Sequence, residues 1–214
     1  MAKIGPFEAH TDRYEEWFEE HGDLYRWEIE AIEALLPSFS EGVEIGIGTG
    51  RFALPLGIRI GVEPSGAMAA RAMEKGLEVI PGTAEELPLP DESFDFALMV
   101  TTICFVDDPA RALAEIRRIL RPGGYVIVGF VDRETPLGRL YLANKEKSRF
   151  YAPATFFSAG ELERLLREAG FGEIEAVQTL FGPDLEHMEG GVKPGTGEGA
   201  FVVLRGRKIS SKEE

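Results

Sequence analysis

The stretch Val43-Glu44-Ile45-Gly46-Ile47-Gly48-Thr49-Gly50 decides how the rest of the chain can fold. Its apolar first half is typical of a short buried strand. The alternate glycines allow a tight turn with positive φ where the strand ends. They also carry no side chain that would keep a ligand away from the backbone. We expect a short helix to start directly afterwards, at Arg51-Phe52-Ala53-Leu54.

Two glutamates accompany this turn. Glu44 lies inside the apolar run, where a carboxylate is costly unless a partner binds it. Turn amides and a cationic group of a ligand are the candidate partners. Glu63 follows 19 residues later (63 − 44 = 19), at the end of the next apolar run, 58–62. A βαβ nucleotide site carries at this place the acid that binds the ribose hydroxyls, so the spacing predicts a nucleotide site.

Strand and helix patterns alternate through the remaining sequence. We expect further strands near 77–80, 94–100, 125–130, 173–180 and 200–205, and helices near 66–75, 109–120 and 158–169. Five alternations followed by two strands joined by a loop predict a doubly wound, mostly parallel α/β sheet that ends in an antiparallel hairpin.

The chain divides into parts of different composition. Residues 1–37 are expected to form an N-terminal appendage of two helices. The second, 24–36, has a broad apolar face and should dock on the main domain, whereas the first is either a lid over a pocket or a surface helix that packs through its aromatic side chains. Residues 38–209 form the main domain, with a polar and aromatic insertion, 132–157, over the active edge. Residues 210–214 are expected to be a tail.

Composition excludes several classes of function. The 214 residues carry 37 acidic and 23 basic side chains, a net charge of −14, which gives no attraction for nucleic acid or for anionic membranes. The single cysteine, Cys104, excludes an internal disulfide and a cysteine-rich metal site, and it is typical of a reducing cytoplasm. We see no signal peptide, no membrane span and no carboxylate–histidine cluster for a metal, and therefore expect a cytoplasmic globular protein.

The glycine turn fits the sequence motifs of two nucleotide-binding families. Residues 48–53 fit the dinucleotide pattern Gly-x-Gly-x-x-Ala. The longer pattern, acid-x-Gly-x-Gly-x-Gly, resembles motif I of the class I S-adenosylmethionine-dependent methyltransferases, and Glu63-Pro64-Ser65 resembles the acidic end of that family's second strand. Segments 82–95 and 114–124 also resemble the family, nearest to the small-molecule and quinone-biosynthesis methyltransferases. The resemblance covers about 43–205 and implies seven strands in the order 3-2-1-4-5-7-6.

The resemblance implies S-adenosylmethionine as the cofactor, bound by the main domain. At its amino-acid end, the amides of Gly46, Gly48 and Gly50 would suit the carboxylate. Glu44 would suit the ammonium group, and Thr101 would face the methionine portion.

At the nucleoside end the same resemblance places Glu63 on the ribose hydroxyls, followed by Pro64, with Ile47 and Met68 beside the adenine. Ala84 and Glu85 would lie near the edge of the adenine. Thr83 stands where the family usually has an aspartate that contacts the adenine amino group.

These features predict a methyltransferase that acts on a small-molecule acceptor. Methyl transfer from a sulfonium needs chiefly proximity and orientation, and we assign no catalytic residue. His10, His21 and His187 are interpreted as surface residues. Four aromatic residues are candidates either for an acceptor pocket or for core packing: Tyr14, Trp17, Phe105 and Tyr141. The alternatives are an NAD(P)- or flavin-dependent oxidoreductase and a non-catalytic nucleoside-binding protein on the same fold.

Overall fold

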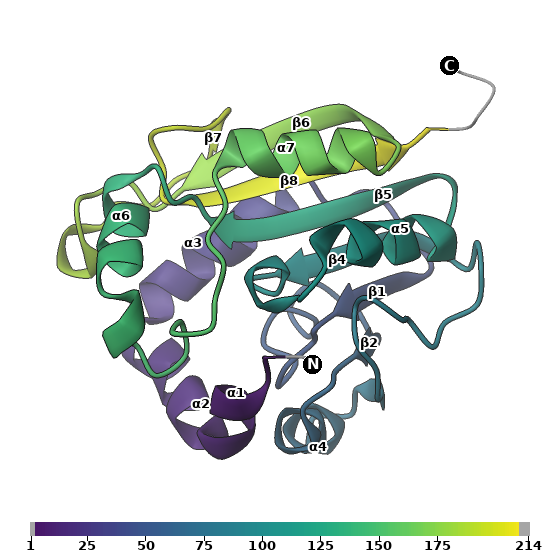
Figure 1. Cartoon of the computed structure of the whole chain (residues 1–214), viewed down its shortest axis with the longest axis horizontal. Coiled ribbons are helices and arrows are strands. Elements are labelled where there is room, and N and C mark those ends of the chain that lie inside the picture. Colours follow the sequence, from purple (N-terminus) through teal and green to yellow (C-terminus); the bar gives the residue numbers. More distant parts are fainter. Residues whose placement is uncertain (1–2, 210–214) are drawn as a thin grey trace.

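A computed structural model describes residues 3–209, and the tail expected at 210–214 lies outside them. Its strands form one sheet in the order β3-β2-β1-β4-β5-β8-β6-β7 (Figure 1). The strands are β1 Gly42–Ile45, β2 Ile60–Val62, β3 Glu78–Ile80, β4 Phe94–Val100, β5 Leu120–Val131, β6 Phe171–Thr179, β7 Lys193–Pro194 and β8 Phe201–Lys208. The strands from β3 to β5 pair in parallel, and β8 pairs antiparallel with both β5 and β6. The predicted doubly wound sheet and its final hairpin are confirmed. The two-residue β7 is an eighth, unpredicted strand.

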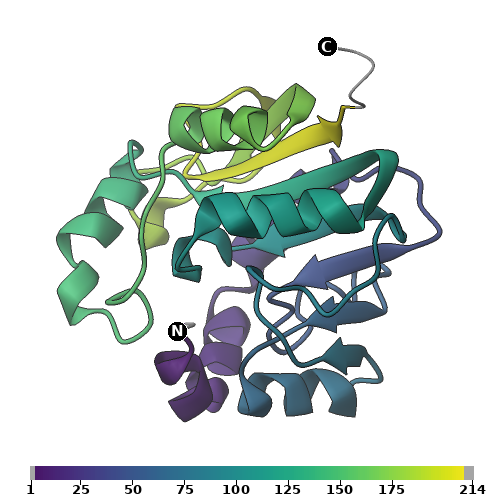
Figure 2. The same cartoon turned by 45° about the vertical axis from the view of Figure 1, so that its right-hand side comes forward.

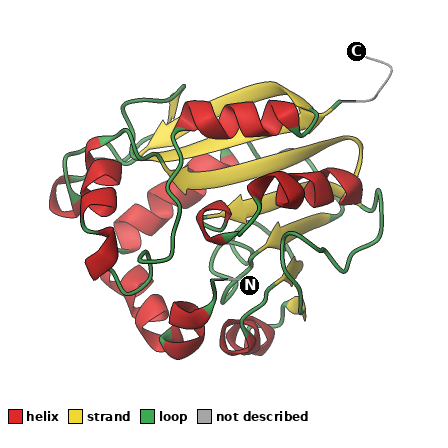
Figure 3. Cartoon of the chain, viewed as in Figure 1, coloured by secondary structure: helices red, strands yellow, loops and turns green. Residues whose placement is uncertain are grey.

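Helices cover both faces of this sheet (Figure 3). They are α1 Gly5–Ala9, α2 Thr11–Glu20, α3 Gly22–Glu33, α4 Gly66–Glu74, α5 Pro109–Ile119, α6 Pro136–Ala143 and α7 Ala159–Glu168, with short 3-10 turns η1 Ile103–Phe105, η2 Lys145–Lys147 and η3 Leu185–His187. In Figure 1, α5 and α7 lie in front of the sheet and α3 lies behind it. Within residues 3–209, no helix has the length and apolar character that crossing a membrane requires.

The local sequence explains why β4, α5 and α7 form close to where they were predicted. Apart from Asp95, β4 is entirely apolar, as a parallel strand covered on both faces must be, and its bounds match the expected 94–100. Asp108 caps α5 by accepting a hydrogen bond from the Arg111 amide at 3.0 Å. Ser158 and Glu161 form a reciprocal capping box at the start of α7.

The short helix expected at 51–54 does not form. Residues 51–57 make loose turns, in which the Leu54 amide donates to the Gly50 carbonyl at 3.2 Å. Pro55 has no amide hydrogen to extend this pattern. Gly57, with a φ of 73°, turns the chain towards β2. The glycine turn is therefore followed by a compact loop without a helix dipole.

The N-terminal region forms three helices where the sequence predicted two. The side chains of α3 share a hydrophobic core with the sheet: Ile29 and Ile32 pack in the same cluster as Phe201. Helix α1 lies beside α4, as the views in Figures 1 and 2 agree. The Glu8 carboxylate accepts hydrogen bonds there from the Ser65 hydroxyl and the Ala67 amide. Whether 1–37 is a separable unit stays a prediction, but α3 is built into the core.

Candidate active site

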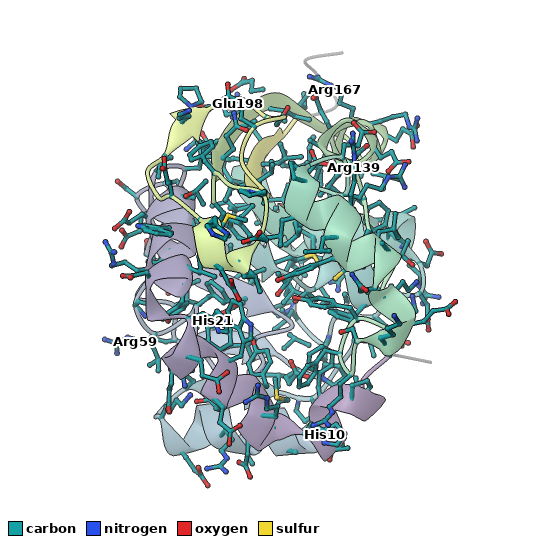
Figure 4. All side chains as sticks on the ribbon, turned by 90° about the vertical axis from the view of Figure 1, so that its left-hand side faces the viewer. His10, His21, Arg59, Arg139, Arg167 and Glu198 are labelled. Atoms are coloured by element: carbon teal, nitrogen blue, oxygen red, sulfur yellow. The ribbon has the colours of Figure 1, made fainter. Side chains whose placement is uncertain are left out.

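A cavity of about 640 Å³ opens at the edge where the parallel strands end, the edge that faces the viewer in Figure 4. This volume is in the range of small-molecule sites, about 300–1,000 Å³. Most of the predicted cofactor residues line it: Gly46, Gly48, Glu63, Pro64, Met68, Thr83, Ala84, Glu85 and Thr101. Glu44, Ile47 and Gly50 are not among the lining residues.

The glycine turn has the positive φ values that its sequence predicted, 74° at Gly46, 57° at Gly48 and 80° at Gly50. A methyl group on Gly46 would lie 2.5 Å from Thr102, and one on Gly50 would lie 2.2 Å from Leu77. Packing therefore requires glycine at these two positions. A methyl group on Gly48 would lie 3.3 Å from Met68 Cε and 3.7 Å from the Tyr14 hydroxyl, so Gly48 keeps the cavity wall clear for a ligand.

The main-chain amides of the three glycines, which we expected to suit a ligand carboxylate, already donate hydrogen bonds within the protein. Gly46 donates to the Val62 carbonyl at 2.8 Å, and Gly50 donates to the Ile47 carbonyl at 2.9 Å. Gly48 donates to Glu63 Oε2 at 2.8 Å. All three amides already have acceptors within the protein, and no helix begins there. These three amides are therefore not free donors in the absence of a ligand.

Glu63 ends β2 with its carboxylate held in place. Besides the Gly48 amide, the Ser65 amide donates to Glu63 Oε1 at 2.9 Å. Burial raises the pKa of Glu63, and these two hydrogen bonds oppose the shift. Each carboxylate oxygen can accept a further hydrogen bond. A fixed carboxylate on the cavity wall fits the paired hydroxyls of a ribose.

Glu44 lies in β1, away from the cavity wall, and is 1% exposed. Its Oε2 has no hydrogen-bond partner among the described residues. Burial, together with the nearby charge of Glu63, raises the pKa of Glu44 well above its usual range. The Ala53 amide donates a hydrogen bond to this carboxylate and opposes the shift. The predicted role at the ammonium group of S-adenosylmethionine stays a prediction.

Three residues predicted to lie near the adenine, Met68, Glu85 and Ile47, have different surroundings in the structure. Met68 is in the first turn of α4, which the Ser65 hydroxyl caps. The Glu85 carboxylate accepts the Asp107 amide at 2.7 Å and so holds the loop before α5. Ile47 is 3% exposed and packs under Gly61, in the core rather than beside a ligand.

Two residues of the cavity wall have strained backbones. Thr101 has a φ of 48° directly after β4, and Leu180 has a φ of 62° directly after β6. Residues other than glycine adopt this region at a cost of about 1–3 kcal/mol, and such strain clusters at functional sites. The strain supports the sequence prediction for Thr101. Nothing in the sequence singled out Leu180.

The far half of the cavity is aromatic. Tyr14 and Trp17 of α2, Phe105 of η1 and Tyr141 of α6 all line it, which agrees with the pocket interpretation of these side chains. The phenyl ring of Phe105 packs edge to face on Phe7 of α1 at 4.9 Å between centroids. The N-terminal helices therefore supply a wall of the site.

Glu28 of α3 also lines this aromatic half, and the sequence analysis missed it. It is 6% exposed, and burial raises its pKa to about 8. One signal was available: Glu28 lies four residues from both Leu24 and Ile32, on the apolar face of its helix. A charge at such a position indicates a function or a buried partner.

The histidines do not take part in the cavity wall. Figure 4 labels His10 and His21, which lie at the junctions of the N-terminal helices. His21 stacks on Trp17, and its Nδ1 lies 3.0 Å from the Trp17 carbonyl oxygen. His187 is exposed and bonds to Asp184. Among residues 3–209, no group of three or more His, Cys, Asp or Glu side chains is arranged to hold a metal ion.

Comparison with known proteins gives consistent results. A methyltransferase domain family matches residues 43–128. A crystal structure of an S-adenosylmethionine-dependent methyltransferase from Thermotoga maritima, named as a possible histamine N-methyltransferase, is 60% identical, with a TM-score of 0.91 over 95% of this chain and 98% of that one. An uncharacterised protein of Methanocaldococcus jannaschii is 42% identical over 95% of this chain and 98% of its own length. A phosphatidylethanolamine N-methyltransferase of Cereibacter sphaeroides is 34% identical over 66% of this chain and 73% of its own length.

These matches agree with the glycine turn, the carboxylate at the end of β2 and the strand order. They also agree with the resemblance that the sequence motifs carried. The chain belongs to the S-adenosylmethionine-dependent methyltransferases.

Proposed function

We propose that this methyltransferase acts on a small molecule held in the aromatic half of the cavity. The observation that carries the proposal is the continuity of one cavity, which runs from Glu63 and Met68 to Trp17 and Tyr141. Its first half matches the residues expected to bind S-adenosylmethionine. The aromatic half is enclosed by α2, α3 and α6, which suits a compact acceptor better than a polymer.

In this proposal Glu63 accepts the ribose hydroxyls, Met68 and Ala84 contact the adenine, and Gly48 leaves room for the methionine chain. When bound, S-adenosylmethionine supplies a methyl group activated by its sulfonium. The protein's part is to orient the acceptor nitrogen, oxygen or carbon towards that methyl and to exclude water. Helices α1 and α2 close the cavity on the solvent side through Phe7, Tyr14 and Trp17.

The names of two relatives guide the choice of acceptor. The Thermotoga protein is named as a possible histamine N-methyltransferase, and the Cereibacter protein is a phosphatidylethanolamine N-methyltransferase. Both names specify nitrogen acceptors. We therefore propose a small amine as the acceptor of this chain as well.

The test is a parallel calorimetric titration with S-adenosylmethionine, S-adenosylhomocysteine, NAD and NADP. We expect micromolar binding of the two adenosyl amino acids and none of the dinucleotides. A second assay then offers small amines, phenols and thiols and measures the S-adenosylhomocysteine formed. Turnover of phenols or thiols alone would contradict the amine proposal. Dinucleotide binding alone would favour an oxidoreductase.

A further inference from the structure

Resting on that proposed function, we propose that Glu28 binds the ammonium group of the acceptor and takes up its proton before methyl transfer. The acceptor is then a primary or secondary amine with a small apolar or aromatic body. Glu28 lies in the cavity wall with several aromatic side chains, and the hydroxyl of Tyr14, in the same wall, lies beside the glycine turn.

Glu28 differs from the other acids of its helix. Asp23 and Glu30 lie on the outer face of α3 and pair with Arg26 at 2.9 and 3.4 Å. Glu28 lies on the inner face, and among residues 3–209 no lysine, arginine or histidine pairs with its carboxylate. Its carboxylate oxygens are not sealed in the core, since the side chain borders the cavity. A buried carboxyl group without a partner is protonated while the cavity is empty, and it can ionise when a cation from outside the chain binds beside it.

The walls around Glu28 suit an organic ammonium ion. Trp17, Phe18 and Tyr141 line the same cavity, and Tyr141 stacks on Tyr151 at 5.3 Å between centroids. Burial raises the pKa of Tyr141, and the charge of Glu28 adds to the shift. Aromatic faces attract organic cations, and the carboxylate supplies the matching charge. An alcohol of the same shape would gain neither contribution.

Tyr14 connects this region with the cofactor side. Its hydroxyl lies 3.7 Å from the position of a methyl group on Gly48. Burial raises the pKa of Tyr14, and the charges of Glu63 and Glu28 both add to the shift. Glu28, Tyr14, Gly48 and Glu63 all line one cavity. An amine held at Glu28 therefore shares that cavity with the residues expected to bind the cofactor.

The chemistry balances with Glu28 as the proton acceptor. An ammonium nitrogen has no lone pair, so it must lose a proton before it can attack. The Glu28 carboxylate takes that proton, and the electron pair of the N–H bond remains on nitrogen. The nitrogen then forms a bond to the methyl carbon while the carbon–sulfur bond breaks, and its electron pair stays on sulfur. The product is an N-methylammonium ion and S-adenosylhomocysteine, and the Glu28 proton passes to solvent. The raised pKa of Glu28, about 8, is closer to that of an amine than an exposed carboxylate's would be.

The experiment compares amines with the alcohols of the same shape in the enzyme saturated with S-adenosylhomocysteine. The probes are histamine, 2-phenylethylamine and butylamine, each paired with its alcohol, and binding is measured by calorimetry. We expect at least one amine to bind the wild type about tenfold more tightly than its alcohol. Glu28→Gln should abolish this preference, and Glu33→Gln, an exposed change on the same helix, should keep it.

Two further measurements separate the possible failures. Unchanged S-adenosylhomocysteine affinity and a cooperative thermal unfolding transition show that Glu28→Gln is folded, and Glu28→Asp, which keeps the charge, should retain part of the preference. If S-adenosylhomocysteine does not bind the wild type, the proposed function fails. If it binds, but no amine is preferred over its alcohol or the preference survives in Glu28→Gln, the role of Glu28 is overturned and the proposed function stands.

Discussion

The Glu15 carboxylate of α2 lies 2.6 Å from a guanidinium nitrogen of Arg51, the residue directly after the glycine turn. The same carboxylate accepts a hydrogen bond from the Thr49 hydroxyl and lies 3.3 Å from Lys75 Nζ. Both members of the Glu15–Arg51 pair are about one-fifth exposed. An acidic side chain of the N-terminal helices thus holds α2 directly on the loop that borders the cofactor region.

Because Glu15 holds α2 on this loop, we predict that it slows the dissociation of S-adenosylhomocysteine from the cavity. Glu15→Gln removes the charge and weakens the pair with Arg51 by about 1 kcal/mol, the scale of a partly exposed ion pair. We expect S-adenosylhomocysteine to dissociate several-fold faster, as measured by stopped-flow fluorescence. Glu16→Gln, on the same helix but in a surface pair with Arg13, is the control and should leave the rate unchanged. Equal rates in both variants would mean that α2 does not have to move for exchange.

We predict that replacing Glu63 by alanine weakens cofactor binding. In the proposed complex Glu63 accepts the ribose hydroxyls, and Glu63→Ala leaves these hydroxyls without their acceptor. Unpaired hydroxyls in the complex cost about 1–3 kcal/mol, so the Kd for S-adenosylmethionine should rise by about 5- to 150-fold. Glu78→Ala, an exposed change on neighbouring β3, provides the control. Unchanged affinity in Glu63→Ala would remove Glu63 from the site.

Buried Glu28 also predicts how stability depends on pH. Its pKa of about 8 exceeds the value near 4.5 that it has when exposed, so the folded chain binds more protons than the unfolded chain between these values. The stabilising contribution is complete below about pH 4.5 and is lost as pH rises towards 8, by at most about 1.4 kcal/mol per pH unit. Glu28→Gln cannot ionise. Its unfolding temperature, measured by calorimetry without ligand, should therefore fall less between pH 5 and 8 than that of the wild type. Parallel curves for the two proteins would contradict the buried, unpaired state of Glu28.

The sequence predicted the sheet well because its strands are decided by local composition. The apolar segment of β4 has little alternative to a strand covered on both faces. Glu44 and Glu63 mark two neighbouring parallel strands, β1 and β2, although turns and not a helix connect them. The eighth strand, β7, was missed because two exposed residues at a sheet edge carry no periodicity. Its pairing with Val177 and Gln178 depends on where the long loop folds back, which is a tertiary effect.

Most residues predicted to bind the cofactor line the cavity, whereas Glu28 in the same wall was not predicted. The glycines and Glu63 come from two short motifs close together in the sequence, but Glu28, Trp17 and Tyr141 come from separate helices and meet only in the folded chain. An acid on an apolar helix face was visible in the sequence. Its significance depended on knowing that the same helix face borders a cavity. The hydrogen bonds of the turn amides to the Val62 and Ile47 carbonyls and to the Glu63 carboxylate likewise depend on the folded structure.

Two deletions at the N-terminus distinguish helices that only cover the cavity, α1 and α2, from a helix that belongs to the core, α3. Removal of residues 1–20 deletes α1 and α2, whose side chains line the cavity and of which Phe18 is the buried residue. We expect this shortened chain to fold, with a lower unfolding temperature, and to lose acceptor binding.

Removal of 1–37 also deletes Ile29 and Ile32 of α3, which pack in the core beside Phe201. Each large core side chain contributes about 2–5 kcal/mol, so losing several exceeds the stability typical of a domain, about 5–15 kcal/mol. Circular dichroism should show a folded chain after the first deletion and an unfolded one after the second. A folded and cofactor-binding product of the second deletion would instead establish 1–37 as a separable unit.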